Sequence, residues 1–576
     1  MILLESDKKL GAVLPNLGEM LKRNAEKFAE RNAFGEIKNG VFVFKSWEKL
    51  YSDVKKTSAG IRKIGFRKND KMIVFSPNRY EMLVLELAIM AGGGISVPIF
   101  AFFHKEAANA LIQHSGAKFI AVAGELQLNR IDLSNTANHI IVFDSITDPQ
   151  FPGLIQFEDI LNSNETEEPD LSLTNENICL NMYTSGTMGI PKCVQLTHGN
   201  ILSQQAALAL EWDLNENDRF LSYLPWHHSF GGIFERFSAL YNGATLALDS
   251  GSGKDMKVLF ANWKQIQPTT FFSVPKVYQS LNQITRLDNE AEQLFYHSGL
   301  KFIFTAAASL PQNLSEEFSK RGVIVREGWG LTETSPCCTL TDPNIVREKG
   351  VVGKPIAGVS IRIADDSEIQ VKGPNVMKGY FHNDEANAKA FTDDGWFCTG
   401  DLGELTPAGL KLNSRKDRIF KLVNGEKVVP SDVEMVLQTK CHYISYAMVV
   451  GNGQEYPVAL IFPNKNMFSH PEFLISPEEG CFCPRSIEEL GKCLRGCLGQ
   501  ANCLVSEKFS RIKAAMIIDD ELSIEKNTLT PSMKLAPNKV FTTYKAHVEN
   551  LYGGENGLDE EVYVVRLDNE VVKERN

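Results

Sequence analysis

The sequence predicts an α/β protein with a large N-terminal domain of sheets flanked by helices and a small α+β C-terminal domain. Its length of 576 residues indicates at least two domains, because a single hydrophobic core rarely serves more than about 250–300 residues. The composition, 43% hydrophobic and 23% charged, is typical of globular proteins. Short β-rich runs alternate with helical patterns up to residue 400, whereas short strands and tight turns follow Asp401.

The N-terminal alternation indicates parallel sheets. The apolar run Lys71–Ser76 precedes an amphipathic pattern over Glu81–Ala91, and further apolar runs begin at Phe119 and Ile140. Near-continuous apolar strands separated by helices are typical of parallel sheets that helices cover on both faces. We therefore expect this layered arrangement in the larger domain.

The most apolar stretch, Leu87–Phe103, is the one candidate for a membrane span that the sequence offers. It is interrupted by Gly92–Gly94 and Pro98, and it is shorter than the about 20 residues that a spanning helix needs. We expect a helix, a glycine turn and a buried strand here, and no transmembrane span.

Charge and cysteine usage exclude several classes of protein. The net charge of −11 argues against nucleic acid as the main partner, because binding a phosphate backbone needs a basic face. Residues 1–9 lack the basic stretch, apolar core and cleavage site of a signal peptide, so a cytoplasmic location is expected. The eleven cysteines are scattered, and those between Cys481 and Cys503 do not have zinc-finger spacing. Free, reduced thiols are therefore expected.

The domain boundary is expected near Asn413–Arg418, where the character of the sequence changes. Beyond it, Asn424-Gly425 between two short apolar runs indicates a hairpin. A polar loop and a helix are expected within Pro471–Cys503, and the acidic tail after Gly553 is expected to pack poorly. The predicted parts are an N-terminal domain (1–413), a hinge (414–418) and a C-terminal domain (419–576).

The strongest chemical signal is the loop Tyr183–Lys192, Tyr-Thr-Ser-Gly-Thr-Met-Gly-Ile-Pro-Lys, which follows the apolar run Ile178–Met182. Glycines let a backbone turn sharply and approach a ligand closely, so its N–H groups and hydroxyls can surround phosphate oxygens. Lys192 adds a positive charge. Because Pro191 precedes this lysine, the loop is not a Walker motif.

Further segments carry residue types that suit small-molecule ligands. Trp329 offers a flat aromatic face, and Glu333 offers a hard carboxylate oxygen of the kind that Mg²⁺ prefers. Asp401 lies in a glycine-rich turn, and its carboxylate can accept hydrogen bonds from two hydroxyls at once. The segments are Leu224–Gly231, Pro268–Lys276, Thr305–Pro311, Glu327–Thr334, Gly395–Gly403, Ser414–Pro430 and Leu529–Leu535.

In their order along the chain and in their residues, these segments resemble the acyl-adenylate-forming superfamily. This superfamily includes acyl-CoA synthetases, firefly luciferases and peptide-synthetase adenylation domains. The resemblance covers about residues 15–545. A surface turn, a core histidine or an exposed charge explains any one segment, but not the whole order. The sequence departs from the family pattern at Met188, Cys193, Ser414, Arg418 and Met533. The residue patterns of Leu224–Gly231 and Leu529–Leu535 are similar to those of long-chain acyl-CoA synthetases.

The resemblance assigns a role to each matching residue. Lys192, His228, Glu333 and Lys534 are the expected catalytic residues, with Lys534 on the mobile C-terminal domain. Thr184 and Glu333 are expected to face magnesium, and Asp417 is expected to be the hinge about which that domain turns. The expected nucleotide-binding residues are Thr184, Ser185, Gly186, Thr187, Gly189, Ala307, Glu327, Gly328, Trp329, Gly330, Thr332, Asp401 and Arg415.

The activity that the resemblance implies is ATP-dependent activation of a carboxylic acid. The acid forms an acyl-AMP with release of pyrophosphate. The similarity of the motifs to those of long-chain acyl-CoA synthetases implies that the acid is a long-chain fatty acid. Coenzyme A then accepts the acyl group. ATP, Mg²⁺ and coenzyme A are the implied cofactors, and no nucleic acid is an expected partner.

Several alternatives stay open at this point. The acceptor could be an acyl carrier protein, and the acid could be medium-chain or aromatic. A non-catalytic nucleotide-binding or acyl-binding protein is the alternative to an enzyme. The intact set of candidate residues argues against this alternative. Membrane contact, if there is any, is expected to be peripheral.

Overall fold

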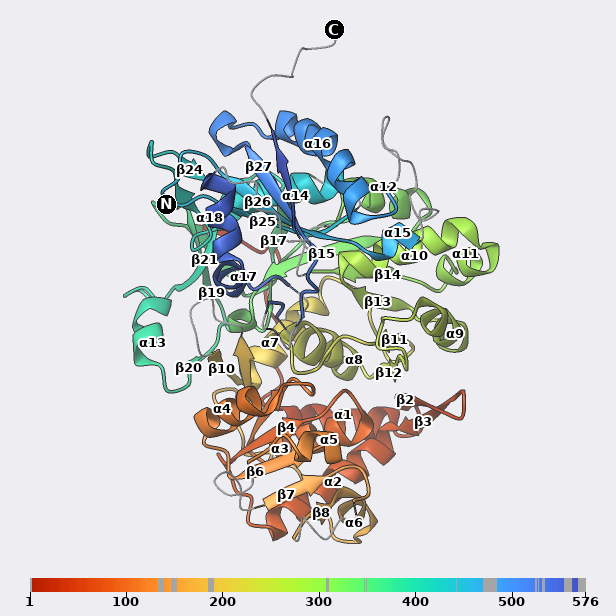
Figure 1. Cartoon of the computed structure of the whole chain (residues 1–576). Helices are drawn as coiled ribbons and strands as arrows, with labels where there is room; N and C mark the ends of the chain where they lie inside the picture. The colour runs from red at the N-terminus through yellow and green to blue at the C-terminus, as the bar shows by residue number, and fades with distance from the viewer. Residues whose placement is uncertain are drawn as a thin grey trace. The chain divides into compact units, whose positions relative to one another are not determined.

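The computed structural model describes residues 3–132, 139–146, 153–184, 191–306, 310–345, 348, 350–441, 443–469, 484–523, 526, 528–530, 534–553 and 562–567. Internal contacts divide the chain into two compact units. The first unit comprises residues 1–399 and 403–412, and the second comprises residues 400–402 and 413–576. Figure 1 labels their helices and strands. The predicted α/β class is confirmed by two large sheets with helices and a smaller C-terminal part.

The first sheet of the first unit has eight strands in the order β20-β10-β9-β5-β4-β6-β7-β8. Its strands from β9 to β8 run parallel, whereas β10 and β20 are antiparallel to their neighbours. The strands are β4 (Lys71–Phe75), β5 (Ile95–Ile99), β6 (Phe119–Val122), β7 (His139–Val142), β8 (Ile155–Gln156), β9 (Ile178–Thr184), β10 (Lys192–Thr197) and β20 (Gly379–Tyr380).

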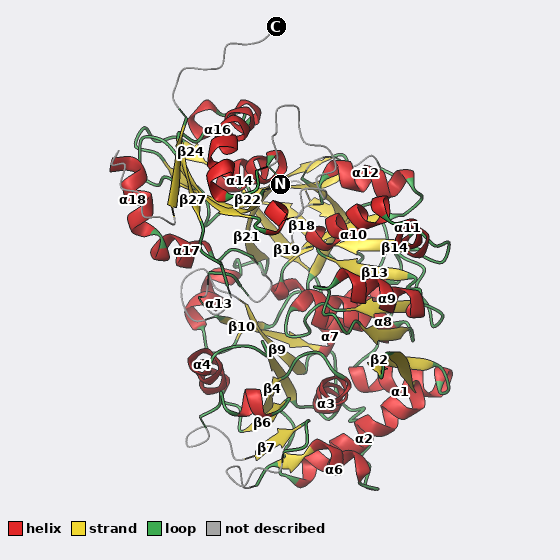
Figure 2. Ribbon diagram, turned by 45° about the vertical axis from the view of Figure 1, so that its right-hand side comes forward, coloured by secondary structure: helices red, strands yellow, loops and turns green. Residues whose placement is uncertain are grey.

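Helices cover this sheet on both faces, as the sequence predicts. Along β4, Met72 and Val74 belong to the largest hydrophobic cluster, which also includes residues of α2 (Trp47–Lys63) and α3 (Tyr80–Ala91). The alternate residues Ile73 and Phe75 pack in a separate cluster with α4 (Lys105–Ser115). Figure 2 shows α3 and α4 on opposite sides of these strands. Side chains of successive strand residues point to opposite faces, which explains the division.

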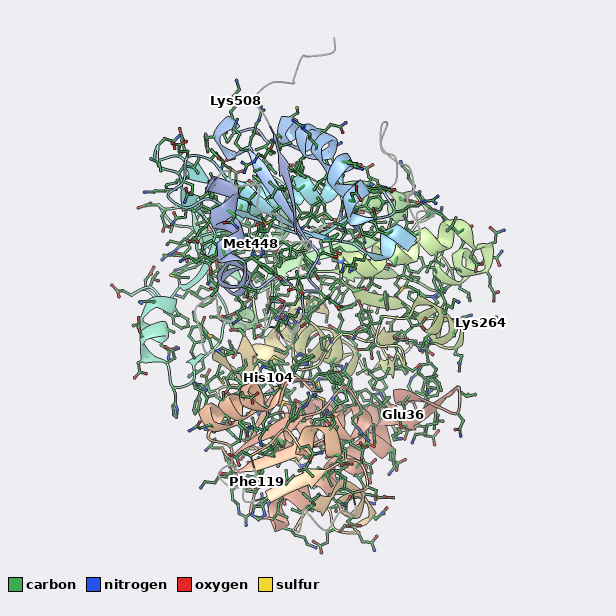
Figure 3. All side chains as sticks on the ribbon, in the orientation of Figure 1. Glu36, His104, Phe119, Lys264, Met448 and Lys508 are labelled. Atoms are coloured by element: carbon green, nitrogen blue, oxygen red, sulfur yellow. The ribbon has the colours of Figure 1, made fainter. Side chains whose placement is uncertain are left out.

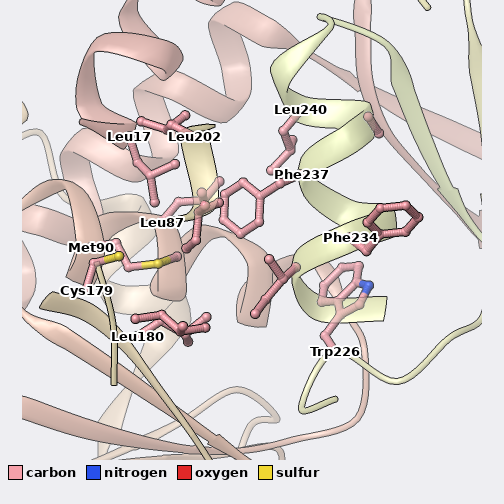
Figure 4. Packing of buried hydrophobic residues seen from close by; sticks show 14 of the residues in the cluster. Leu17, Leu87, Met90, Cys179, Leu180, Leu202, Trp226, Phe234, Phe237 and Leu240 are labelled. Atoms are coloured by element: carbon pink, nitrogen blue, oxygen red, sulfur yellow. The ribbon is translucent and has the colours of Figure 1, made fainter. Parts of the chain in front are cut away.

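The prediction that residues 81–91 form an amphipathic helix is wrong in one respect. They do form α3, and a glycine turn and the buried strand β5 follow, but α3 is buried all round. Its buried charged residue Glu86 is accommodated by an ion pair with Arg236 and a 2.8 Å hydrogen bond donated by Ser96 Oγ. Figure 4 shows Leu87 and Met90 of α3 packed near Phe237 and Leu180.

The second large sheet has fourteen strands in the order β1-β18-β19-β21-β22-β17-β16-β15-β14-β13-β11-β12-β2-β3. The stretch from β2 to β15 is parallel, but strands after β15 pair antiparallel where the pairing is described. The prediction of parallel strands therefore holds only from β2 to β15 in this sheet, because short turns replace crossover helices beyond residue 330. The strands are β1 (Leu3–Glu5), β2 (Asn32–Lys38), β3 (Val41–Ser46), β11 (Arg219–Ser222), β12 (Thr245–Leu248), β13 (Thr270–Ser273), β14 (Phe302–Thr305), β15 (Val325–Gly330), β16 (Cys337–Leu340), β17 (Val351–Pro355), β18 (Ser360–Ile363), β19 (Glu368–Lys372), β21 (Phe397–Thr406) and β22 (Gly409–Arg415).

The other helices of the first unit are mostly amphipathic and pack on these sheets. On α9 (Met256–Ile266), Lys264 points to the surface (Figure 3), whereas Leu259 and Trp263 are buried. The helices are α1 (Leu17–Phe28), α5 (Glu125–Leu128), α6 (Phe157–Asn162), α7 (His198–Leu208), α8 (Arg236–Tyr241), α9 (Met256–Ile266), α10 (Pro275–Leu287), α11 (Asn289–Phe295), α12 (Gln312–Lys320) and α13 (Asp384–Ala390), with the π-helix Phe230–Glu235 and the 3₁₀-helix Thr332–Thr334.

The second unit is built on a four-stranded sheet in the order β25-β26-β27-β28. The predicted hairpin around Asn424-Gly425 is present, with Gly425 at φ +86°. The predicted helix within 471–503 is α16, but residues 470–483 and 554–561 lie outside the described residues. The elements are β23 (Phe420–Lys421), β24 (Lys427–Val428), α14 (Pro430–Lys440), β25 (Ile444–Val450), β26 (Val458–Pro463), α15 (Asn466–Ser469), α16 (Ile487–Leu504), β27 (Ala514–Ile518), α17 (Pro537–Thr543), α18 (Lys545–Gly553) and β28 (Val562–Arg566).

The structure also bears on the expectations about a membrane span and about the cysteines between Cys481 and Cys503. Over the described parts of the chain, the structure contains no helix that is both long and apolar enough to cross a membrane. Cys493, Cys497 and Cys503 lie on α16, while Cys481 and Cys483 lie outside the described residues.

Candidate functional site

The two ends of the glycine-rich loop are held together by strand pairing. Thr184 ends β9, Lys192 begins β10, and the antiparallel register places these two residues directly opposite each other. Thr184 Oγ1 donates a 3.4 Å hydrogen bond to the Lys192 carbonyl oxygen. The predicted phosphate-binding residues between them, Ser185, Gly186, Thr187 and Gly189, lie outside the described residues. The sheet therefore fixes where the loop begins and ends.

Tyr380 connects Lys192 to Glu333. The Lys192 ammonium lies 4.8 Å from the centroid of the Tyr380 ring, and the Tyr380 hydroxyl donates a 2.8 Å hydrogen bond to Glu333 Oε1. Glu333 is 9% exposed. The structure thus brings together a predicted cation and a predicted metal ligand that are far apart in the sequence. Sequence reasoning missed Tyr380, because only the pairing of β20 with β10 places it there.

Local hydrogen bonds fix the segment that carries Glu333. The 3₁₀-helix 332–334 begins with the Leu331 N–H donating to Thr334 Oγ1 over 2.9 Å. The Met377 N–H donates to the Glu333 carbonyl oxygen over 2.8 Å. The Thr332 and Ser229 hydroxyls share a 3.0 Å hydrogen bond, which joins this segment to the predicted substrate-side segment Leu224–Gly231.

The segment with His227 and His228 leads into the π-helix 230–235. A Cβ atom added at Gly232 would lie 1.9 Å from the Trp226 carbonyl oxygen, so the close backbone approach requires glycine. His228 Nδ1 accepts a 3.3 Å hydrogen bond from the Phe230 N–H. Desolvation lowers the pKa of His227 to about 3, with a smaller effect of His228, so its imidazole is neutral at pH 7. Isolated π-helical turns frequently occur at functional sites.

Residues of β15, the strand predicted to bind the base, pack mainly against other protein atoms. Trp329 is 8% exposed and belongs to the largest hydrophobic cluster, so little of its ring faces solvent. A Cβ atom at Gly330 would lie 1.6 Å from the Pro336 carbonyl oxygen, and one at Gly328 would lie 2.8 Å from Phe304. Glu327 accepts a 3.3 Å hydrogen bond from the Leu310 N–H. Packing alone accounts for these glycines, and Ala307 lies outside the described residues.

Four predicted residues gather within the second unit. Arg415 Nη1 lies 2.9 Å from Asp401 Oδ1, and its Nε lies 3.4 Å from Asp417 Oδ1. Burial alone would lower the pKa of Arg415, but the two carboxylates outweigh it and raise that pKa above its ordinary value. Lys534 is an exposed residue, yet protein atoms crowd its ammonium group, and this desolvation lowers the pKa of Lys534. Asp401 opposes that decrease and Arg415 adds to it.

A tight turn presents Lys534. The Thr530 N–H donates to the Lys534 carbonyl oxygen over 2.8 Å, and the Lys534 N–H donates to Thr530 Oγ1 over 3.2 Å. Leu529 and Leu535 form a β-bridge at the base of the turn. The backbone of Lys534 is therefore fixed beside this bridge.

Comparison with protein families decides which group the chain belongs to. A model described as AMP-binding enzyme matches residues 21–381, and a model described as AMP-binding enzyme C-terminal domain matches residues 417–556. The chain belongs to the AMP-binding enzyme family. The resemblance that the sequence motifs indicate is thereby confirmed.

Curated relatives of this AMP-binding enzyme include long-chain-fatty-acid ligases. The long-chain-fatty-acid–CoA ligase FadD15 of Mycobacterium tuberculosis is 26% identical, over 90% of this chain and 94% of its own. The chloroplastic long-chain-fatty-acid–acyl-carrier-protein ligase AEE15 of Arabidopsis thaliana is also 26% identical, over 93% of this chain and 86% of its own.

Solved structures share the fold. The o-succinylbenzoate CoA synthetase MenE of Bacillus subtilis, in complex with an acyl-adenylate intermediate, has a TM-score of 0.73 at 23% identity over 92% of this chain and 98% of its own. The anthranilate CoA ligase AuaEII, in complex with anthranoyl-AMP, has a TM-score of 0.76 at 18% identity over 94% of this chain and 99% of its own.

Proposed function

We propose that this AMP-binding enzyme activates a long-chain fatty acid with ATP to an acyl-AMP and then transfers the acyl group to coenzyme A. The observation that carries the proposal is the meeting of Lys192 and Glu333 on Tyr380. It gathers a phosphate-binding cation and a metal-binding carboxylate beside the ends of a glycine-rich loop.

The first half-reaction requires charge to be neutralised. A fatty-acid carboxylate attacks the α-phosphorus of ATP, and pyrophosphate leaves. Both reactants are anionic, so the site has to compensate the repulsion and hold them in line. Lys192 and Lys534 supply positive charge in this account. No general base is needed, because the carboxylic acid is already ionised at pH 7.

The residues present suit magnesium bound with the triphosphate rather than in a protein cage. Within the described residues there is no group of three or more His, Cys, Asp and Glu side chains that could hold a metal ion. Glu333 is a single buried carboxylate, and Tyr380 joins it to Lys192, which pairs with the hydroxyl residue Thr184. Mg²⁺ is commonly held by one or two carboxylates plus substrate phosphates and waters. Magnesium, when bound, would stabilise charge on the phosphate oxygens.

The second half-reaction transfers the acyl group to a thiol. The thiolate of coenzyme A attacks the acyl carbonyl carbon of the acyl-AMP, the thioester forms, and AMP leaves. In this account the domain turns at Asp417, and Lys534 serves only the first half-reaction. The hairpin at 424–430 would then serve the second. Separation of the two steps limits hydrolysis of the adenylate.

The names of the relatives support a long-chain acid, and one of them supports a second acceptor. FadD15 is a long-chain-fatty-acid–CoA ligase, whereas AEE15 is a long-chain-fatty-acid–acyl-carrier-protein ligase. Acyl carrier protein is therefore the second candidate acceptor. Medium-chain and aromatic acids remain alternatives for the donor.

The proposal is tested by pyrophosphate release with ATP and Mg²⁺ over acids from acetate to oleate, plus benzoate, with coenzyme A present or absent. Release that peaks with the long chains and yields acyl-CoA is the expected result. Release without acylation of coenzyme A would transfer the proposal to acyl carrier protein. No release with any acid would overturn it and leave the non-catalytic alternative.

A further inference from the structure

Tyr380 touches opposite charges at its two ends. It is 5% exposed, its hydroxyl donates to Glu333 Oε1 over 2.8 Å, and its ring lies 4.8 Å from the Lys192 ammonium. None of the roles assigned so far uses this residue. Its contacts are nevertheless with two of the residues on which the proposed chemistry depends.

The backbone around Tyr380 is fixed on both sides. Tyr380 pairs with Val194 between β20 and β10. The Tyr380 N–H donates to Asn387 Oδ1 over 2.7 Å, and Asn387 Nδ2 donates back to the Tyr380 carbonyl oxygen over 2.8 Å. Gly379 has φ +151°, and a Cβ atom there would lie 3.0 Å from Asn387 Oδ1. The direction of the tyrosine ring is therefore set by its surroundings.

The same segment also holds the backbone of Glu333. The Met377 N–H donates to the Glu333 carbonyl oxygen over 2.8 Å, and Asn375 Nδ2 donates to the Thr334 carbonyl oxygen over 3.0 Å. Among the residues that the structure describes, Tyr380 is the side chain that hydrogen-bonds the Glu333 carboxylate. Backbone and side chain of the glutamate are thus fixed from one segment, 375–380.

We propose that Tyr380 is a positioning residue that orients the Glu333 carboxylate toward a magnesium–triphosphate ligand. Its hydroxyl occupies Oε1 and leaves Oε2 for the ligand, while its ring keeps the Lys192 ammonium beside the same ligand. The inference rests on the proposed function. Mg²⁺ demands near-ideal geometry, and outer partners that orient a ligand typically change metal affinity about 10–100-fold.

The structure offers a matched control for a purely structural role. Tyr80 is 2% exposed, its hydroxyl donates to Asp53 Oδ2 over 2.8 Å, and the Lys45 ammonium lies 4.4 Å from its ring. It therefore makes the same two kinds of contact as Tyr380. None of Tyr80, Asp53 and Lys45 is a candidate site residue.

The test measures ATP binding to full-length Tyr380→Phe, Tyr80→Phe and wild-type protein by the shift in melting temperature, over a series of Mg²⁺ concentrations and in EDTA. Both variants should lose similar thermal stability without ATP. Only Tyr380→Phe should raise the Mg²⁺ concentration for half-maximal ATP stabilisation, by about tenfold. Because its phenyl ring still faces Lys192, the stabilisation by ATP in EDTA should equal that of wild type.

The outcomes separate this inference from the proposed function. If wild type shows Mg²⁺-dependent ATP binding and Tyr380→Phe has the same Mg²⁺ requirement, the positioning role is overturned and the proposed function stands. An equal change in Tyr80→Phe would also overturn it. If wild type shows no Mg²⁺-dependent binding of ATP, both the inference and the proposed function are overturned.

Discussion

The candidate residues of the first unit and those of the second unit are held by different forces. Thr184 and Lys192 are fixed by strand register, and Glu333 is 9% exposed. In the second unit, the Arg415 side chain is 44% exposed and pairs with Asp401 and with the 37% exposed Asp417. Hydrophobic packing and backbone pairing resist salt, whereas exposed ion pairs are weak and screened.

This contrast separates groups that stay in place during the proposed reaction from groups that move. A group that has to stay in place through a reaction is best held by strand pairing or by burial, and a group that has to move is best held by contacts that cost little to break. In the proposed function, Lys192 and Glu333 belong to the first kind, and Lys534 belongs to the second.

The largest effect is expected for Lys534→Ala, which removes the mobile cation. Loss of a charge-stabilising group aimed at developing charge typically lowers a rate by about 10²–10³-fold. We expect a decrease of this size in pyrophosphate release, with an unchanged melting temperature, because Lys534 is an exposed residue. Lys539→Ala, an exposed lysine on α17, is the matched control. Similar rates for the two variants would contradict the assigned role.

The next largest effect is expected for glycines in the two regions. Gly330→Ala forces a Cβ atom to within 1.6 Å of a carbonyl oxygen, and overpacking of a core costs about 1–3 kcal/mol or more. Gly425→Ala meets no atom within 4 Å, although φ is +86°, so a cost of about 1 kcal/mol is expected. Denaturant unfolding followed by probes in each unit measures both values. Equal costs would contradict a tightly packed first unit and a lightly constrained hairpin.

The first unit should also lose stability in acid. His198 is fully buried, and desolvation lowers its pKa to about 4 from an ordinary 6.5. Between these values the unfolded chain binds more protons, so the free energy of unfolding falls as pH decreases through that window, by up to about 3 kcal/mol.

His198→Asn keeps an acceptor for the Leu17 N–H, which donates to His198 Nδ1 over 3.3 Å, and it cannot titrate. Urea unfolding at pH 7 and pH 4.5 should therefore show a smaller loss in this variant. An unchanged pH dependence would exclude His198 as its source.

The smallest effect is expected for Asp401→Asn, in the charge cluster of the second unit. The change removes a carboxylate from Arg415 and from the proposed ribose contact. Hydrogen bonds to charged groups contribute about 1.5–3 kcal/mol, so the ATP concentration for half-maximal pyrophosphate release should rise at least about tenfold. Stability should change by less than about 1 kcal/mol. A normal ATP requirement would refute the ribose role.

Sequence reasoning predicted the elements that periodicity and glycine turns control. The strands β4, β5 and β9, the hairpin at Asn424-Gly425 and the α/β class follow from such local patterns. The amphipathic interpretation of α3 failed because Glu86 is neutralised by Arg236, a residue from a distant helix. The antiparallel half of the large sheet was missed because strand direction depends on connections that apolar runs do not reveal.

The site shows the same limit. Thr184, Lys192, Glu333, Asp401, Arg415 and Lys534 were nominated from motifs, but their roles stay predictions. The contact of Tyr380 with Glu333 and Lys192 depends on the pairing of β20 with β10. No local sequence pattern predicts that pairing. Packing also explains Gly328 and Gly330 without a ligand, which a motif alone does not distinguish.

The most direct test of the central claim is the identity of the nucleotide product. Wild-type protein is incubated with ATP, Mg²⁺ and oleate without coenzyme A, and the products are identified by mass spectrometry. The account predicts oleoyl-AMP and pyrophosphate in equal amounts, with no ADP. Formation of ADP and phosphate, or recovery of ATP unchanged, would contradict activation of the acid as an adenylate.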